Sequence, residues 1–334
     1  YRLYIDNVTI YGMSGGVATP VFTPSAGLLT SPTNISIACA SPNSDIYYTT
    51  NGTAPDSNST LYTIPINIST TTTVKAIAYV GDTASGVATA IYTFPVEVPN
   101  IAAFRAANTT TSATIYKITG DVVFVFRSGN NIYIQDNSGA ILIYDSYTPV
   151  ITTTYNEGDV ISGGILGSYT LYNGLVEMIP VQNTAPSTSN IGLITPTEVS
   201  IDDINSNYVA YESKLVKITN VIFAAGTYTT ASATNINFYQ NGDSITCRNV
   251  FKTLDMTIAA GYNANVVGFP LRYNTTNQIA PRSNADITPY TPVQNPSIII
   301  NSPTEGAIFL TTDHFNASIS IQDFVLGTDG LLKL

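Results

Sequence analysis

Short runs of alternating apolar and polar residues dominate this chain. Val, Ile, Thr and Tyr recur at every second position, and Gly, Pro, Asn and Asp interrupt the runs at intervals of about ten residues. Alternation with a period of two is typical of half-buried β-strands joined by tight turns. The strongly apolar runs, 122–126 and 298–300, are far shorter than the ~20 residues of a membrane-spanning helix. The pattern predicts an all-β protein that does not span a membrane.

Four joints that contain proline, at 18–20, 94–99, 195–196 and 288–292, divide the chain into segments. The segments are 1–19, 20–98, 99–195, 196–290 and 291–334. Because proline stiffens a short linker, we expect an elongated string of modules that fold independently.

Residues 20–98 are expected to form a compact sandwich of about seven strands. A strand at 46–49 runs into Asn51-Gly52, a dipeptide that favours a type I′ hairpin because both residues tolerate positive φ. Two further strands are expected at 62–68 and 73–79.

Three sequence segments of this module, Pro20-Val-Phe-Thr-Pro24, the stretch 46–53 and Thr73-Val-Lys-Ala-Ile-Ala78, carry a family resemblance. They resemble the immunoglobulin-like domain at the C-terminus of chitobiase and β-hexosaminidase enzymes. In that family the module is an accessory, and the sugar-cleaving residues lie in another domain. The resemblance implies an Ig-like β-sandwich without a catalytic role.

A weak internal repeat connects the next two segments. Residues 104–123 align without a gap with 204–223 at an offset of 100, which places Lys117-Ile-Thr119 on Lys217-Ile-Thr219 and Val122 on Ile222. Further on, 131–134 parallels 235–238, and 160–163 parallels 265–268. Each copy is expected to begin with a short helix, at 100–108 or 198–207.

About five strands follow in each copy, which suits an OB-like Greek-key barrel. In the first copy we expect these strands at 114–126, 131–135, 140–145, 159–169 and 175–181. The fold class is therefore an all-β string of modules: an Ig-like sandwich, two OB-like barrels and the start of a second Ig-like sandwich in 291–334.

The segment Gly158-Asp-Val160, which opens the expected fourth strand, and residues 280–287 carry a second resemblance. They are similar to the tandem OB-fold-like modules of secreted nucleases and other surface proteins of Bacteroidetes. The resemblance implies an extracellular or cell-surface protein, exported as a type IX secretion cargo, with secretion or surface-anchoring machinery among its partners.

Both ends of the chain are expected to be cuts through a longer polypeptide. Residues 4–10 resemble the closing strand of an upstream jelly-roll-like domain, and 296–309 resemble the opening of an Ig-like domain of bacterial surface proteins.

Composition narrows the function further. Only 10% of residues are charged, and 12 basic against 22 acidic residues give a net charge of −10, which disfavours a nonspecific polyanion binder. The single histidine, His314, and the two cysteines, Cys39 and Cys247, leave little material for histidine-dependent catalysis, a zinc site or a disulfide scaffold. We expect no enzyme activity, cofactor or metal, and two cysteines that serve as small buried hydrophobes.

OB barrels bind single-stranded nucleic acid or oligosaccharide on the face of strands two and three, between loops 1-2 and 4-5. The first copy offers binding candidates there, because aromatic faces stack on bases or sugar rings: Arg127, Tyr133, Tyr144, Tyr169 and Tyr172. The alternative is that these tyrosines simply cover the core and rim of the barrel. Three basic against six acidic residues in this copy, and six against seven in the second, disfavour nucleic acid.

Two acidic segments invite a calcium interpretation that we do not favour. Asp136-Asn-Ser-Gly139 is simpler as a turn, and Asp202-Asp203 as a helix start. Thr83 and Ser244 each follow Asp and precede an apolar residue. The resemblance to Bacteroidetes proteins marks them as possible O-glycosylation sites.

The preferred hypothesis is a noncatalytic spacer and binding region of a secreted, multidomain surface protein. The alternative is an accessory region, binding single-stranded DNA or glycan, of a secreted nuclease or glycoside hydrolase whose catalytic domain lies outside this chain.

Overall fold

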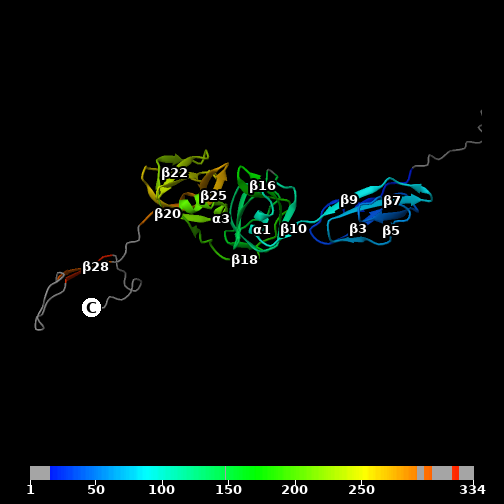
Figure 1. Cartoon of the computed structure of the whole chain (residues 1–334), viewed down its shortest axis with the longest axis horizontal. Coiled ribbons are helices and arrows are strands. Elements are labelled where there is room, and N and C mark those ends of the chain that lie inside the picture. Colours follow the sequence, from blue (N-terminus) through cyan, green and yellow to red (C-terminus); the bar gives the residue numbers. More distant parts are fainter. Residues whose placement is uncertain (1–15, 147, 292–296, 303–317, 323–334) are drawn as a thin grey trace, which may run out of the picture.

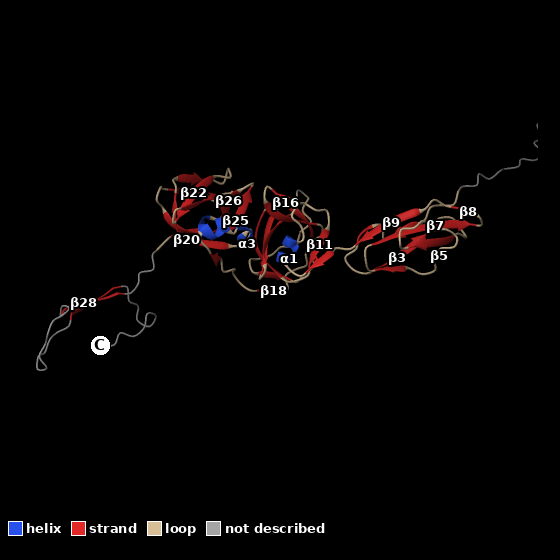
Figure 2. Cartoon of the chain, in the orientation of Figure 1, coloured by secondary structure: helices blue, strands red, loops and turns tan. Residues whose placement is uncertain are grey.

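The computed structural model describes residues 16–146, 148–291, 297–302 and 318–322. Along the long axis of the molecule, a β-sandwich is followed by two small β-barrels that lie side by side (Figure 1). Strands are by far the most common regular element in the described residues, and the few helices are short (Figure 2). Among these helices, none has the length and apolar character needed to cross a bilayer. The predicted all-β, multimodule fold class is confirmed.

The sandwich consists of two sheets with the strand orders β1-β3-β6 and β2-β9-β7-β4-β5, and β8 pairs with β7. Ile35, Val74 and Tyr92 are fully buried between the sheets. The strands are β1 (Val21–Thr23), β2 (Gly27–Leu28), β3 (Thr33–Ala38), β4 (Asp45–Thr49), β5 (Thr60–Leu61), β6 (Ile66–Ile68), β7 (Thr72–Val80), β8 (Thr83–Ala84) and β9 (Ala88–Thr93).

The type I′ hairpin expected at Asn51-Gly52 is not formed. Such a turn needs positive φ at both residues, and only Gly52, at 79°, has it. Instead, the side-chain oxygen of Asn51 accepts hydrogen bonds from the backbone nitrogen (3.1 Å) and the hydroxyl (2.6 Å) of Thr53, forming a local turn. Of the two strands expected at 62–68 and 73–79, the first is present only over 66–68, as β6, and the second is present as β7; the two belong to opposite sheets.

Each of the next two segments forms a closed five-stranded barrel in which the strands pair in the order 1-2-3-5-4-1, with strands 3 and 5 parallel. In the first barrel, strands 1 to 5 are β11 (Ile115–Ile118) with β12 (Val122–Ser128), β13 (Asn131–Asp136), β14 (Gly139–Tyr144), β15 (Asp159–Ile161) with β16 (Ile165–Tyr172), and β17 (Leu175–Pro180). In the second they are β20 (Val216–Phe223), β22 (Asn235–Gln240), β23 (Asp243–Arg248), β25 (Asn263–Tyr273) and β26 (Thr276–Ala280). The two copies therefore share one pairing order, as expected for a duplicated β-barrel.

Shorter elements extend these barrels. A strand pairs in parallel with strand 1 of each: β10 with β11 and β19 with β20. The additional elements are β10 (Val96–Val98), α1 (Ile101–Ala106), β18 (Ser189–Asn190), β19 (Thr197–Glu198), α2 (Ile201–Ser206), α3 (Tyr208–Tyr211), β21 (Gly226–Tyr228), β24 (Met256–Ile258), a 3-10 turn at Asn284–Asp286, β27 (Ile287–Pro289), and the hairpin β28 (Ser297–Ser302) with β29 (Ser318–Gln322).

The expected helix at the start of each barrel is present and closes its core. Ile101 and Phe104 of α1 are fully buried, and so are Ile201 and Ile204 of α2 at the predicted offset of 100. In α2, Ser200 and Asp203 form a reciprocal capping box, which confirms that Asp202-Asp203 serves a helix start.

In each barrel, a side chain on strand 2 also accepts a hydrogen bond from the first backbone nitrogen of the helix. Asp136 accepts from Ile101 at 2.9 Å, and Gln240 accepts from Ile201 at 2.9 Å. The other oxygen of Asp136 accepts from the backbone nitrogens of Ser138 (2.7 Å) and Gly139 (3.0 Å). The interpretation of 136–139 as a turn is therefore correct.

The gap-free alignment of the two copies fails after Ile118 and Ile218. Strand 1 pairs with strand 4 on both sides of a short interruption. The interruption is three residues long in the first barrel, 119–121, and two residues long in the second, 219–220. Val122 thus corresponds to the equally buried Val221, and its predicted match with Ile222 is wrong.

The match of 160–163 with 265–268 is also wrong. Gly167 lies opposite Tyr116 as Gly268 lies opposite Val216, so these two glycines are equivalent. At both, a Cβ would come too close to strand 5, within 2.6 Å of the Ile179 carbonyl oxygen or 2.8 Å of the Ala280 carbonyl oxygen. Strands 4 and 5 therefore need glycine at this position in both barrels.

The two barrels are not independent, contrary to the expectation from the joint at 195–196. A shared apolar cluster packs between them, and Ile194, in the joint itself, is part of it. At its centre the ring of Tyr133 stacks on that of Phe269, with 4.0 Å between centroids and 13° between planes. Arg105 of the first barrel also pairs with Glu212 of the second at 2.8 Å, where both side chains are buried. These contacts make the barrels one body.

Of the two cysteines, which lie in separate modules, Cys247 is the buried hydrophobe that was predicted, whereas the thiol of Cys39 donates to the carbonyl oxygen of Ala18 at 3.1 Å. Cys247 is fully buried in the second barrel, and burial raises the pKa of its thiol to about 12. Cys39 is half-buried in the sandwich.

Several predictions at the ends of the chain fall outside the described residues. These are the jelly-roll-like strand at 4–10 and the surroundings of His314. Within 291–334, where the start of an Ig-like sandwich is expected, the structure describes the antiparallel hairpin β28–β29.

Candidate binding site

Two of the five predicted binding residues are buried by the protein itself. Tyr169 is 3% exposed and packs in the core of the first barrel, with its ring 5.8 Å from that of Phe104. Tyr133 is 1% exposed beneath the second barrel. For Tyr169, and for the stacking face of Tyr133, the alternative interpretation is correct: these rings cover apolar surface.

The guanidinium of Arg127 is engaged in contacts within its own barrel. Its guanidinium donates to the carbonyl oxygens of Gly129 (3.2 Å) and Ile151 (3.1 Å) and lies 3.5 Å from a carboxylate oxygen of Asp145. Asp145, which is 1% exposed, also accepts from the backbone nitrogens of Val150 and Ile151. Arg127 therefore fastens the loop after strand 3 and is not free to hold a ligand.

The remaining two predicted residues, Tyr144 and Tyr172, line a cavity of about 310 Å³ between the barrels. Tyr133 also contributes to its wall. The second barrel contributes groups that the sequence did not single out as a site: Arg248, Leu271, Arg272, Tyr273 and Gln278. Glu177, on β17 of the first barrel, completes the polar part of the wall.

Equivalent positions of the two barrels line this cavity together. Strand register equates Tyr172 with Tyr273 and Glu177 with Gln278. It also equates Tyr144 with Arg248. The cavity is thus assembled from the same three places in each copy, but with different chemistry at two of them.

The 4-5 turns of the two barrels meet next to the cavity. The backbone nitrogen of Asn274 donates to the carbonyl oxygen of its counterpart Asn173 at 2.7 Å. Gly174, at φ +84°, permits this approach, because a Cβ there would lie 2.6 Å from the Asn274 oxygen. This contact fixes the tyrosines that flank the turns, Tyr172 and Tyr273.

Glu177 is the buried acid of the site. It is 7% exposed, and its carboxyl accepts no hydrogen bond from the residues that the structure describes. Burial and the nearby charge of Glu212 raise its pKa to about 7. A substantial fraction of this carboxyl is therefore protonated, and able to donate, at neutral pH.

Two arginines bring positive charge to the same cavity. Arg272 lies over the ring of Tyr208, with 3.9 Å between its central carbon and the centroid, and its Nε donates to Asn277 at 3.0 Å. Arg248 contacts Asn235 at 3.4 Å. Within the described part of the chain, neither has a carboxylate partner at ion-pair distance.

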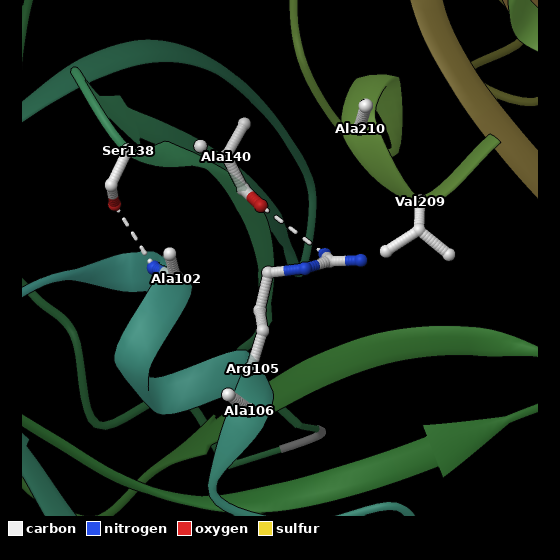
Figure 3. A pocket seen from close by; sticks show the side chains of 8 residues that line it. Ala102, Arg105, Ala106, Ser138, Ala140, Val209 and Ala210 are labelled. Atoms are coloured by element: carbon white, nitrogen blue, oxygen red, sulfur yellow. Dashed lines mark hydrogen bonds between the residues drawn. The ribbon is translucent and has the colours of Figure 1, made fainter. Parts of the chain in front are cut away.

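A second cavity of about 310 Å³ lies beside α1 and α3 (Figure 3). Its walls are small side chains such as Ala102, Ala106 and Ala210, and its charged group is Arg105. That guanidinium donates to the carbonyl oxygen of Ala140 at 3.3 Å and pairs with Glu212 (Figure 3 shows the former contact). Because Arg105 is already satisfied, this cavity offers a ligand little polar chemistry.

The candidate modification sites are exposed. Thr83 lies on β8 of the sandwich and Ser244 on β23 of the second barrel. Their glycosylation stays a prediction. In the part of the chain that the structure covers, no three His, Cys, Asp or Glu side chains gather as a metal site requires.

Comparison with known families gives one match, over residues 35–92, to the family described as Fn3 associated. The match lies inside the sandwich, between β3 and β9, and supports a β-rich module of Ig-like type there. No curated protein matches the chain.

Proposed function

We propose that this chain is a noncatalytic, carbohydrate-binding and spacing region of a secreted, multidomain protein at the cell surface. The cavity between the barrels carries the binding part of this proposal. It combines three tyrosines, Tyr144, Tyr172 and Tyr273, with side chains that donate and accept several hydrogen bonds. Sugar rings present CH faces that stack on aromatic rings and hydroxyls that need such polar partners.

The exposure of the tyrosines supports this assignment. Tyr172 is 60% exposed and Tyr273 is 55% exposed, at the turns where the barrels meet. Exposed aromatic rings at a cavity rim are available to a ligand without any change in the core. The backbone hydrogen bond between Asn274 and Asn173 sets the positions of the two turns that carry these rings before binding, which lowers the entropic cost of ordering them.

The setting of the protein is proposed from the sandwich and the surface. The Fn3-associated match, the resemblance of 20–98 to the chitobiase-type Ig-like domain and a surface with few charges all support an extracellular module. The resemblance of the barrels to tandem modules of Bacteroidetes surface proteins supports export as a type IX secretion cargo.

The alternative, an accessory region of a secreted glycoside hydrolase, uses the same cavity and is favoured by the chitobiase-type resemblance. A single-stranded DNA accessory role is less well supported. In the first barrel the face of strands 2 and 3, on which such a ligand would lie, is covered by the second barrel through Tyr133 and Phe269. The second barrel leaves this face open but carries six basic against seven acidic residues, which does not make a basic groove.

Glycan-array screening of this chain, followed by calorimetry on the sugars that bind, tests the proposal. We expect Tyr172→Ala and Tyr273→Ala each to weaken binding about ten-fold or more, as expected when a stacking ring is lost. Tyr239→Ala, which removes a 44% exposed tyrosine on β22 away from the cavity wall, is the matched control. An absence of sugar binding, or steeply salt-dependent binding of oligo-dT in its place, contradicts the proposal.

A further inference from the structure

The charged groups of the cavity define the kind of sugar more narrowly. Resting on the proposed function, we infer that the cavity selects an acidic sugar, one that carries a carboxylate such as a uronic acid, and that Arg248 and Arg272 hold its carboxylate. Both arginines come from the second barrel, whereas the first barrel supplies two of the three stacking tyrosines, Tyr144 and Tyr172.

Most arginines of the described chain have an acidic partner. Of the five, Arg105, Arg127 and Arg282 are paired with carboxylates, in a chain whose net charge is −10. Arg248 and Arg272 have no such partner among the described residues. A planar guanidinium matches a carboxylate with two parallel hydrogen bonds, and an amide or hydroxyl of a neutral sugar does not provide that geometry.

Arg272 is positioned before any ligand arrives. The ring of Tyr208 lies beneath its guanidinium, and Asn277 accepts from Nε. These contacts leave its two terminal nitrogens without an acceptor in the described structure, so both remain available to a carboxylate. Because the side chain is already ordered, binding costs little rotamer entropy.

Glu177 completes the recognition of an acid. Its side chain is more than nine-tenths buried, lines the cavity and accepts no hydrogen bond from the described residues. In its protonated form it donates one hydrogen bond to a ligand oxygen. Gln278, its equivalent in the second barrel, lines the same cavity and offers an amide donor. A carboxylate between these groups meets donors from both barrels.

The dimensions favour a short sugar over a nucleic acid strand. A volume of about 310 Å³ lies at the lower end of the range for small-molecule sites, which suits one or two rings. Single-stranded nucleic acid is bound in a continuous basic groove over several nucleotides. The contact between Asn274 and Asn173 lies beside the cavity, where such a groove would have to pass.

Calorimetry with two matched ligands tests the inference: oligogalacturonate and the neutral galacto-oligosaccharide of the same length. We expect the intact chain to bind the acidic ligand at least ten-fold more tightly. Arg248→Gln and Arg272→Gln are each expected to remove about ten-fold of that preference while neutral binding stays the same. Lys75→Gln, which removes a positive charge in the sandwich, is the charge-matched control.

The outcomes separate this inference from the proposed function. Equal affinity for both ligands, or a preference that survives both arginine substitutions, overturns the acidic selectivity and leaves sugar binding intact. No binding of either ligand, nor of any sugar on the array, overturns both. If Arg272→Gln unfolds the second barrel, as near-ultraviolet circular dichroism would show, Arg248→Gln alone decides the outcome.

Discussion

The two barrels share one strand order but present opposite outer faces. On strands 1 to 3 the first barrel displays Val125, Tyr133 and Leu142, all buried under its neighbour. The second barrel has Asn237 where the first has Tyr133, and Thr246 where the first has Leu142. Asn237 is exposed and Thr246 is half-buried. One copy uses this face to pack, and the other leaves it open to solvent.

Strands 4 and 5 show the reverse. Phe269 and Leu271 of the second barrel are buried against the first. Their counterparts in the first barrel, Ser168 and Thr170, are polar. At these faces the packing is therefore asymmetric, with Tyr133 on strand 2 of the first barrel against Phe269 on strand 4 of the second, although the 4-5 turns meet at equivalent positions.

The strongest test of this comparison exchanges the residues at one equivalent position. We expect Tyr133→Asn to lower the free energy of unfolding by about 4 kcal/mol, because it removes a buried ring and buries an amide in its place. The reverse exchange, Asn237→Tyr, lies on an exposed face and is expected to change it by less than about 0.5 kcal/mol. Urea denaturation of both variants measures the difference. Effects of similar size would show that the faces do not differ as described.

Breaking an ion pair is expected to have a smaller effect on the free energy of unfolding. Glu212→Gln leaves Arg105 buried without its carboxylate, and we expect a loss of about 3 kcal/mol. The control is Glu198→Gln, which breaks the exposed pair with Lys217 and is expected to cost less than about 0.5 kcal/mol. Thermal and urea unfolding of the two variants measure both losses of stability. A cost for Glu198→Gln as large as that for Glu212→Gln would refute the role of the interface.

The smallest of the three expected changes in stability depends on pH. It tests the difference between Glu177 and its equivalent, Gln278. The pKa of Glu177 is raised in the folded protein to about 7, so its ionisation opposes folding as pH rises from the unfolded value through 7. Glu177→Gln removes this penalty, and we expect about 2 kcal/mol more stability at pH 8 and almost no change at pH 4.

Gln278→Glu is the complementary variant, because it places an acid at the equivalent buried position. We expect it to lose stability as pH rises from 4 to 8. Unfolding curves at both pH values measure the two variants together. A stability of Glu177→Gln that tracks the parent chain at every pH would contradict the buried, unpartnered state of Glu177.

The local features that the sequence predicted correctly depend on near neighbours. The buried positions of α1 and α2, the turn at 136–139 and the capping box at Ser200 each need only a few adjacent residues. The expectation at Asn51-Gly52 was wrong although it was local, because the Asn51 side chain formed a competing turn with Thr53. The repeat alignment lost its register where strand 1 has one additional residue in the first barrel.

The candidate site was only partly predictable. Tyr144 and Tyr172 do line a cavity, but the same alternation of tyrosines also places Tyr169 in the core. A period of two tells which residues share a face and not which face is covered. In strands 4 and 5 the copies follow an offset of 101, which equates Tyr172 with Tyr273 and Glu177 with Gln278, but this offset is defined by strand pairing and not by the sequence pattern.

Alternating polarity and turn residues determined, from the sequence alone, that this chain forms β modules with a duplicated barrel. They could do so because the pattern of apolar residues within a strand indicates which of its own positions are buried. The docking of one barrel on the other was decided only in the tertiary structure. Residues far apart in the chain, such as Tyr133 and Phe269, meet there, and Arg248, Arg272 and Glu177 become neighbours across the contact. Nothing in the pattern of a single strand specifies a partner surface, since that depends on the shape and charge of two folded barrels at once.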